Sequence, residues 1–301
     1  MIIETDGLAK RYGRADALVD LTMRVDAGEV FGFLGPNGAG KTTAVKLLLG
    51  LARPTRGRGS VLGAPLGDRA TRRRIGYLPE LFRYQPWLHA REVVELHGRL
   101  IGGGIDRSRQ AVDRILEEVG LADRADDLVG GFSKGMQQRL GLGVALLGAP
   151  TLIVLDEPTS ALDPVGRADV RTIIRRAREA GSTIFLNSHL LTEVERVCDR
   201  VAIVDRGRVL ADGRLDDLLG APAVRIRVTD LPPPAKVALE RFGRVAAGED
   251  DWLTISGIEP DSVPDAVAAI AGAGGRVHAV DAGRATLEER YMELIGRAES
   301  A

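Results

Sequence analysis

One stretch, Gly35-Pro36-Asn37-Gly38-Ala39-Gly40-Lys41-Thr42-Thr43, constrains the fold of this chain more than any other. It lies between an apolar run at 30–34 and a mostly apolar run at 44–49, an order that predicts a buried strand, a tight loop and a helix. The glycines let backbone N–H groups converge, and the helix adds free N–H groups and the positive end of its dipole. Lys41 would bring a cation to the β- and γ-phosphates of a nucleotide, and Thr42 a hydroxyl to Mg²⁺. We therefore expect all nine residues, Gly35 to Thr43, to form a phosphate-binding loop for ATP or a similar nucleotide.

Composition narrows the class of protein. The 301 residues suffice for one large and one small domain, and 45% of them are hydrophobic. A formal net charge of −1 gives no overall attraction to nucleic acid, and the single cysteine, Cys198, excludes an internal disulfide. Residues 140–155 carry no charge but are too few to span a membrane and contain Gly148 and Pro150. The N-terminus does not resemble a signal peptide, so a soluble, cytoplasmic protein is expected.

The order of apolar runs predicts two domains. Strands near the N-terminus precede a helical region at about 84–150, and strands then alternate with helices up to about residue 204, which predicts a mostly parallel sheet. From 224 to 280 the order is β-α-β-β-α-β, which is ferredoxin-like, followed by an amphipathic helix at 286–295. We expect an α/β nucleotide-binding domain at 1–220 and a small α+β accessory domain at 221–301.

A second motif, Leu152-Ile153-Val154-Leu155-Asp156-Glu157-Pro158, places two carboxylates after a buried strand. Ligands bind at this end of the strands in α/β sheets, so Asp156 is expected to reach the Mg²⁺ held by Thr42. Glu157 is then placed to polarise the attacking water. Apolar runs ending in an acid are common, and it is the pairing with the phosphate-binding loop that favours this function.

Between the two motifs, Phe132-Ser133-Lys134-Gly135-Met136-Gln137-Gln138-Arg139-Leu140 resembles the signature sequence of ABC transporter ATPases. Ser160-Ala161-Leu162-Asp163 resembles the D-loop of that family, Ser188-His189 its switch histidine, and Tyr12 the aromatic residue that stacks on adenine. Because the motifs occur in order from residue 2 to 220, we identify the chain as a member of the family. The alternative to these family roles is that Ser133 only caps a helix and that His189 is only a residue at the start of a helix.

The resemblance implies an ATPase that dimerises head to tail, with each ATP between the loop of one protomer and the signature helix of the other. Lys41, Glu157 and His189 would be catalytic, and Thr42, Glu80 and Asp156 would hold Mg²⁺. Further nucleotide contacts would come from Tyr12 and Asp163 and, in trans, from Ser133, Lys134, Gly135 and Met136. Either a homodimer or a heterodimer with a related ATPase fits this scheme.

Two positions depart from the family pattern. Glu80 stands where a glutamine is usual, and Lys134 and Met136 replace a glycine and a glutamine of the signature. Glu80 can bind the metal but repels ATP, and Lys134 is a hypothetical compensating cation. These features, and the C-terminal domain, are similar to ATPases of bacterial exporters of drugs, lipids, polysaccharides or ions, in which that domain would stabilise the dimer or regulate it.

We therefore expect the ATP-hydrolysing subunit of an exporter, held at the inner face of the cell membrane by a separate integral permease. A soluble ABC ATPase acting on nucleic acid or ribosomes is the first alternative, although such proteins carry tandem ATPase domains or a long coiled coil, and no nucleic-acid partner is expected. A subunit that senses ATP without hydrolysing it is the second. Trp87 could contact the permease or lie in the core, and His89 and His97 lack companions for a metal site.

Overall fold

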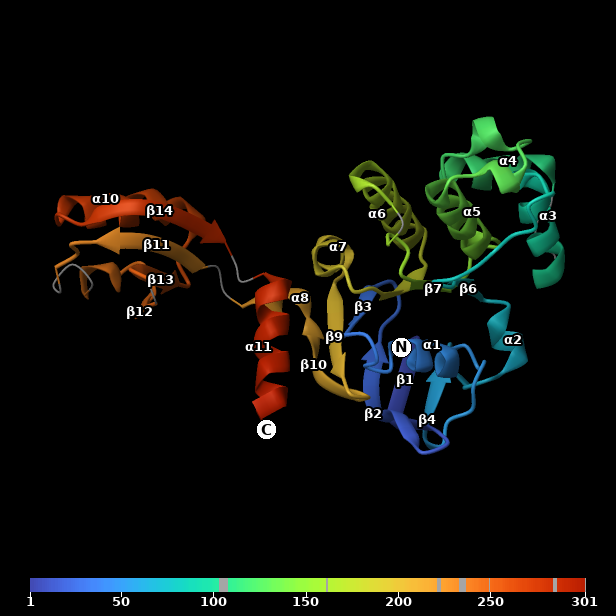
Figure 1. Ribbon diagram of the computed structural model, residues 1–301, viewed down its shortest axis with the longest axis horizontal. Helices are drawn as coiled ribbons and strands as arrows, with labels where there is room; N and C mark the ends of the chain where they lie inside the picture. The colour runs from blue at the N-terminus through green and yellow to red at the C-terminus, as the bar shows by residue number, and fades with distance from the viewer. Residues whose placement is uncertain are drawn as a thin grey trace. The chain divides into compact units, whose positions relative to one another are not determined.

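The computed structural model describes residues 1–102, 108–160, 162–220, 223–232, 237–248, 250–283 and 286–300 (Figure 1). The chain forms two compact units, one from Met1 to Arg214 and the other from Leu215 to Arg297. The division between the units lies slightly before the expected domain boundary at residue 220. Among the described residues, no helix combines the length and apolar character needed to cross a membrane.

The first unit is built on a ten-stranded sheet in the order β5-β4-β1-β2-β10-β9-β3-β8-β7-β6. The half that contains β9, β3, β8, β7 and β6 is parallel, whereas β1, β2, β4 and β5 pair antiparallel. The sequence predicts that Tyr12 lies in the turn between the first two strands, but Tyr12 is the last residue of β1. The strands are β1 (Ile3–Tyr12), β2 (Ala15–Val25), β3 (Val30–Leu34), β4 (Arg56–Val61), β5 (Ala64–Pro65), β6 (Ile75–Leu78), β7 (Leu152–Asp156), β8 (Thr183–Asn187), β9 (Arg200–Asp205) and β10 (Arg208–Arg214).

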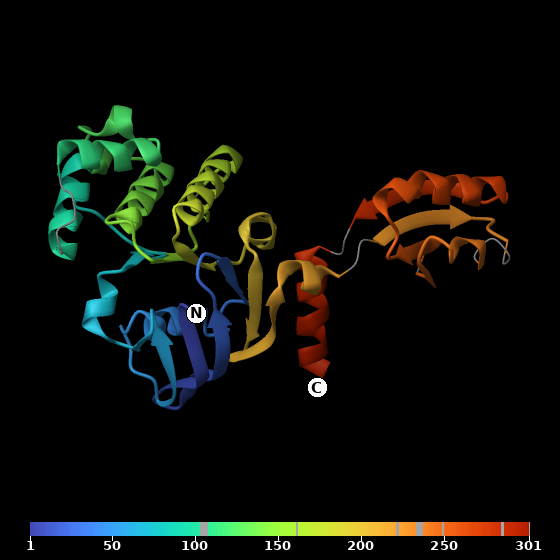
Figure 2. The same ribbon diagram turned by 180° about the vertical axis from the view of Figure 1, so that it is seen from behind.

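Helices cover this sheet, and three of them gather in one region as predicted for residues 84–150 (Figures 1 and 2). The helices are α1 (Lys41–Leu48), α2 (Arg69–Arg72), α3 (Ala90–Ile101), α4 (Arg109–Glu118), α5 (Lys134–Leu146), α6 (Pro164–Glu179) and α7 (Leu191–Val197), with 3₁₀ turns η1 (Ala122–Arg124) and η2 (Val129–Gly131). The sequence at 93–100 has apolar residues at helical spacing, which predicts that Val93, Val94, Leu96 and Leu100 share one buried face, and this prediction is partly wrong. Val93 and Val94 are buried, but Leu96 and Leu100 are exposed, because the period of the pattern continues beyond the surface that α3 packs against.

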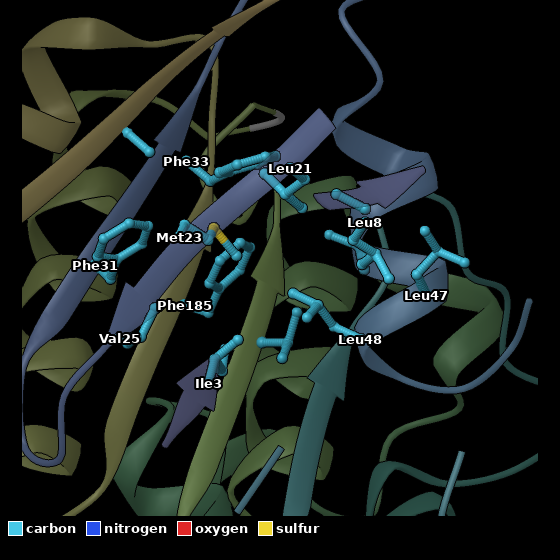
Figure 3. Packing of buried hydrophobic residues seen from close by; sticks show 14 of the residues in the cluster. Ile3, Leu8, Leu21, Met23, Val25, Phe31, Phe33, Leu47, Leu48 and Phe185 are labelled. Atoms are coloured by element: carbon cyan, nitrogen blue, oxygen red, sulfur yellow. The ribbon is translucent and has the colours of Figure 1, made fainter. Parts of the chain in front are cut away.

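The core lies around the central parallel strands. Every residue of β3, β7 and β8 is buried, which explains their continuous apolar runs. Phe185 lies beside Phe31 and Phe33, with ring centroids 5.9 Å and 5.3 Å away (Figure 3). This packing fixes the ends of β3, β7 and β8, where the candidate site is found.

Gly76 allows α5 to approach β6 closely. A Cβ atom at this position would lie 1.9 Å from the carbonyl oxygen of Ala145, so Gly76→Ala must displace α5. We expect a loss of about 2–4 kcal/mol in the free energy of unfolding, measured by urea denaturation. Gly131→Ala is the control, because nothing lies within 4 Å of the added atom. Equal stability of the two variants would contradict this view of the packing.

The second unit contains a four-stranded antiparallel sheet in the order β12-β13-β11-β14, which confirms the predicted ferredoxin-like order. One sheet face packs on helical residues such as Leu239, Ala266 and Ile270. Of the helix expected at 233–242, residues 233–236 lie outside the described part and 237–239 are helical. The elements are α8 (Leu215–Leu219), β11 (Ala223–Thr229), β12 (Arg244–Ala247), β13 (Trp252–Ser256), η3 (Pro260–Ser262), α10 (Val263–Gly272), β14 (Arg276–Gly283) and α11 (Leu287–Ser300).

Candidate nucleotide-binding site

The site forms where three parallel strands end at the same edge of the sheet. The phosphate-binding loop follows β3, Asp156 ends β7, and Asn187 ends β8 directly opposite Asp156. Because β3 pairs with β8 and β8 with β7, the three segments lie next to one another. This is the edge at which α/β sheets bind ligands.

The phosphate-binding loop depends on its glycines. Gly40 has a φ of 101°, and a Cβ there would lie 2.4 Å from the carbonyl oxygen of Ala17. The buried Lys41 side chain donates hydrogen bonds to the carbonyl oxygens of Gly35 (2.7 Å) and Pro36 (3.2 Å). Burial lowers the pKa of Lys41, and the carboxylates of Glu157, Asp156 and Glu80 oppose that shift. The ammonium group of Lys41 thus interacts electrostatically with three nearby carboxylates.

A cavity of about 420 Å³ opens beside this loop. It contains side chains from all three strand ends and from Glu80, which follows β6. Its lining residues are Ala17, Pro36, Asn37, Gly38, Gly40, Lys41, Thr42, Thr43, Glu80, Asp156, Glu157, Asn187 and His189.

Asp156 is only 2% exposed, and its carboxylate accepts a hydrogen bond from Nδ2 of Asn187. Burial raises the pKa of Asp156, and the charges of Glu80 and Glu157 raise it further, whereas the Asn187 bond and Lys41 lower it. The ionised carboxylate is therefore costly to the folded protein until a cation joins the site.

Glu157 connects the acid cluster to His189. Its Oε2 lies 2.8 Å from Nδ1 of His189, and Oγ of Ser188 donates to the same oxygen over 3.4 Å. The backbone of Glu157 has a φ of 53°, and its N–H donates to the carbonyl oxygen of Asn187 at 2.9 Å. This turn directs the carboxylate into the cavity.

Other expected nucleotide contacts lie outside this cavity. Tyr12 is 47% exposed at the end of β1, with Nζ of Lys10 4.9 Å from its ring centroid. Oγ of Ser133 accepts from the N–H of Met136, and Asp163 accepts from the N–H of Gly166, so both cap helices. Lys134, Gly135 and Met136 begin α5 and do not line the cavity either. Ala161 of the D-loop lies outside the described residues.

Two residues of the cavity, Asn187 and Ala17, were not singled out from the sequence. Asn187 has a signal in hindsight, because it is a polar residue at the end of an otherwise apolar strand, as Asp156 is. Ala17 contributes from β2, and an alanine in a strand carries no such signal.

The residues at the cavity fit Mg²⁺ and a nucleotide. Oxygen donors, the ligands that Mg²⁺ prefers, come from Thr42, Asp156 and Glu80. Oδ1 of Asn187 is buried and has no hydrogen-bond partner within the described part of the chain. A side chain at Gly40 would not fit against Ala17, so the loop keeps a tight glycine turn, a kind of turn whose backbone N–H groups can bind phosphate.

Asp156→Asn should stabilise the nucleotide-free protein at neutral pH. The pKa of Asp156 is raised in the folded protein, so ionisation of this carboxyl lowers the free energy of unfolding. This loss of stability is absent below the pKa of the unfolded chain, grows as pH rises toward the folded-state pKa, and is complete above it. We expect a gain of about 1 kcal/mol in the free energy of unfolding near pH 7, shrinking toward about pH 4. Urea denaturation at both pH values without Mg²⁺ tests this, with Asp123→Asn as an exposed control. A loss of stability at neutral pH would show that the carboxylate is not a net cost.

Comparisons with known proteins agree with this site. Residues 18–160 match the family model described as ABC transporter. An uncharacterized ABC transporter ATP-binding protein of Nostoc sp. is 39% identical over 287 residues, which cover 95% of this chain and 85% of that protein. The daunorubicin resistance ATP-binding protein DrrA3 of Streptomyces coeruleorubidus is 37% identical, with 98% and 96% covered. The Nod factor export ATP-binding protein I of Burkholderia orbicola is 34% identical, with 98% and 97% covered.

Solved structures agree as well. The ATP-binding subunit of an ABC transporter is 34% identical with a TM-score of 0.65, covering 72% of this chain and 92% of that one. A dimeric ATP-binding cassette in a post-hydrolysis state, bound to ADP and Pi, is 25% identical with a TM-score of 0.65, covering 71% and 99%. The resemblance found in the sequence is thereby confirmed, and the chain belongs to the ABC transporter family as an ATP-hydrolysing, ATP-binding subunit.

Proposed function

We propose that this chain drives export: it hydrolyses ATP as a dimer beneath a separate membrane permease. The relatives named for daunorubicin resistance and for Nod factor export, which match nearly the whole chain, support this direction. The observation that carries the catalytic proposal is the Glu157 carboxylate, which faces the same cavity as Lys41 and lies 2.8 Å from His189.

In this proposal each side chain of the cavity has one task. Lys41 binds the β- and γ-phosphates, and the loop N–H groups surround them. Thr42, Asp156 and Glu80 hold Mg²⁺, which neutralises phosphate charge when bound. Glu157 orients the attacking water and accepts its proton, while His189 contacts the γ-phosphate and restrains the Glu157 carboxylate. Asn187 orients Asp156 through their hydrogen bond.

The second half of the site would come from another protomer. Ser133, Lys134, Gly135 and Met136 stand at the N-terminus of α5 and do not line the cavity of their own chain, which fits a role in trans. The solved cassette that is dimeric and bound to ADP and Pi supports a dimer. Tyr12 would stack on adenine, and Asp163 would contribute a further contact to the nucleotide. We take the homodimer as the working assembly.

The permease would bind near the surface between β6 and α3. Trp87 is 70% exposed and Leu81 is 88% exposed, so Trp87 is not a core residue. Large exposed apolar side chains often mark protein interfaces. Such docking would place the ATPase at the cytoplasmic face of the membrane. The C-terminal unit would serve as an accessory domain that stabilises the dimer or regulates it.

Trp87→Ala should weaken association with the permease while leaving ATP hydrolysis by the isolated subunit within about twofold. The measurement is co-purification of the protein with the integral membrane proteins of detergent-solubilised membranes from its own cells. Val165→Ala is a matched control, because Val165 is 68% exposed on α6. Undiminished recovery of Trp87→Ala would move the docking surface elsewhere.

The electrostatic compensation between Glu80 and Lys134 is a hypothesis about a contact between two protomers. Glu80 lines the cavity, and Lys134 is exposed at the start of α5. If Lys134 of one protomer offsets Glu80 of the other, Lys134→Gly should weaken ATP binding about three- to tenfold, and Glu80→Gln should restore it. Equilibrium ATP binding tests both variants, and unchanged affinity and turnover in Lys134→Gly would end the hypothesis.

Single-turnover ATP hydrolysis and membrane pull-down together test the proposed function. Hydrolysis by the isolated protein separates it from an ATP sensor, and recovery with the permease separates it from an ATPase that acts on nucleic acid. Stimulation of turnover by nucleic acid in place of the permease would overturn the export proposal.

A further inference from the structure

Gln138 is a buried amide on an otherwise apolar part of α5. Its side chain is only 5% exposed, and Leu140 and Leu142 nearby on the helix are buried apolar residues. A buried amide without a partner costs free energy, so its contacts are informative. Nε2 of Gln138 donates to the backbone carbonyl oxygen of Glu157 at 3.4 Å. The helix that begins after Ser133 is thus bonded to the residue that presents the carboxylate at the cavity of the same chain.

The backbone of Glu157 needs such support. A φ of 53° is unfavourable for a residue with a side chain, so contacts around it must hold the conformation. Its N–H is held by the carbonyl of Asn187, and its carbonyl accepts from the hydroxyl of Ser160 at 3.1 Å. Asn187 lines the cavity, and Ser160 lies in the segment just after Glu157. The Gln138 amide adds a contact from the helical region.

We infer that Gln138 is a positioning residue for ATP hydrolysis, which holds the Glu157 carbonyl so that the carboxylate keeps its orientation toward the cavity. The inference rests on the proposed function, because it assumes that Glu157 orients the attacking water and that Ser133 serves the nucleotide of the partner. Ser133 at the start of α5 would then contact the nucleotide bound by the partner, while Gln138 in the same helix supports hydrolysis of the nucleotide bound by its own chain.

The first test uses Gln138→Met, which keeps the length of the side chain but removes the donor. Loss of one such bond should lower kcat about three- to tenfold and leave KM for ATP within about twofold. Gln110→Met is the matched control, since Gln110 is exposed on α4 and lies outside the signature sequence. Gln138→Asn keeps a polar amide, but its side chain is too short to reach the Glu157 carbonyl. It should therefore lower kcat as Gln138→Met does, and it provides a second variant if Gln138→Met folds poorly. Thermal unfolding of each variant separates a change in kcat from a loss of folded protein.

The second test asks which nucleotide site Gln138 serves. Mixed dimers are assembled from two differently tagged copies, one of which carries Glu157→Gln and does not hydrolyse ATP. Gln138→Met should lower the rate three- to tenfold when placed in the copy with intact Glu157, and leave it within about twofold when placed in the other copy.

Two results would overturn the inference: equal losses from Gln138→Met in either copy, or equal kcat for Gln138→Met and Gln110→Met in the homodimer. Failure of the proposed function has a different signature. If Glu157→Gln hydrolyses ATP at the wild-type rate, the role of Glu157 is wrong, whatever Gln138 does.

Discussion

Glu157→Gln is expected to lower kcat for ATP hydrolysis by about 10²–10⁴ while nucleotide binding survives. The amide has nearly the shape of the carboxylate and can still contact Ser188 and His189, so the cavity should keep its geometry. It cannot accept the proton of the attacking water, which is the task assigned to the carboxylate. Lys41, Thr42 and Asp156 are untouched, so the affinity for Mg-ATP should change by less than about threefold.

The control for this variant is Glu179→Gln, which removes an exposed carboxylate at the end of α6 and should retain wild-type kcat. Single-turnover hydrolysis measures the chemical step, and light scattering measures the assembly. Because hydrolysis no longer removes the bound nucleotide, Glu157→Gln should accumulate as a dimer with Mg-ATP. Adding Ser133→Arg, which places a bulky side chain at the tip of α5, should return it to a monomer. A Glu157→Gln protein that stays monomeric at high concentration, or that keeps full turnover, would contradict the shared site.

The parts of the site that follow from local patterns could be predicted from the sequence. The runs at 152–156 and 183–187 are buried strands because central parallel strands are covered on both faces, so their ends could be located to the residue. The phosphate-binding loop follows from glycine spacing, and the cap at Ser133 follows from its side chain.

Contacts set by packing between distant segments could not be predicted. The bond between Asn187 and Asp156 depends on the register between β7 and β8, and the bond from Gln138 to Glu157 depends on how α5 lies across the strand ends. Neither register nor helix placement is encoded in a local pattern. The same limit explains α3, in which the helical period of apolar residues includes Leu96 and Leu100 although the helix buries only one side of that stripe.

Lys41→Met should abolish most of the binding of ATP, by about 100-fold or more in affinity. Nζ of Lys41 is already buried and held by the carbonyls of Gly35 and Pro36, so little further ordering is needed when phosphate arrives. Its removal leaves Glu80, Asp156 and Glu157 facing the phosphates without the one protein cation that lines the described cavity next to them. Methionine matches the length of lysine, and the loop should keep its path.

Ligand-dependent stability measures this loss without assuming that the variant is as stable as the wild type. At an ATP concentration of about 100 times the wild-type Kd, ATP should stabilise the wild type by about 2.7 kcal/mol, and a 100-fold weaker variant by about 0.4 kcal/mol. For a domain of this size the wild-type effect corresponds to a rise in Tm of about 5–10 °C. Each protein is compared with itself with and without nucleotide, so changes in the nucleotide-free state cancel. Lys46→Met, on the same helix as Lys41 but outside the cavity lining, should retain the full shift. If Lys41→Met also retains it, the lysine does not bind phosphate, and the loop must hold the nucleotide through its backbone alone.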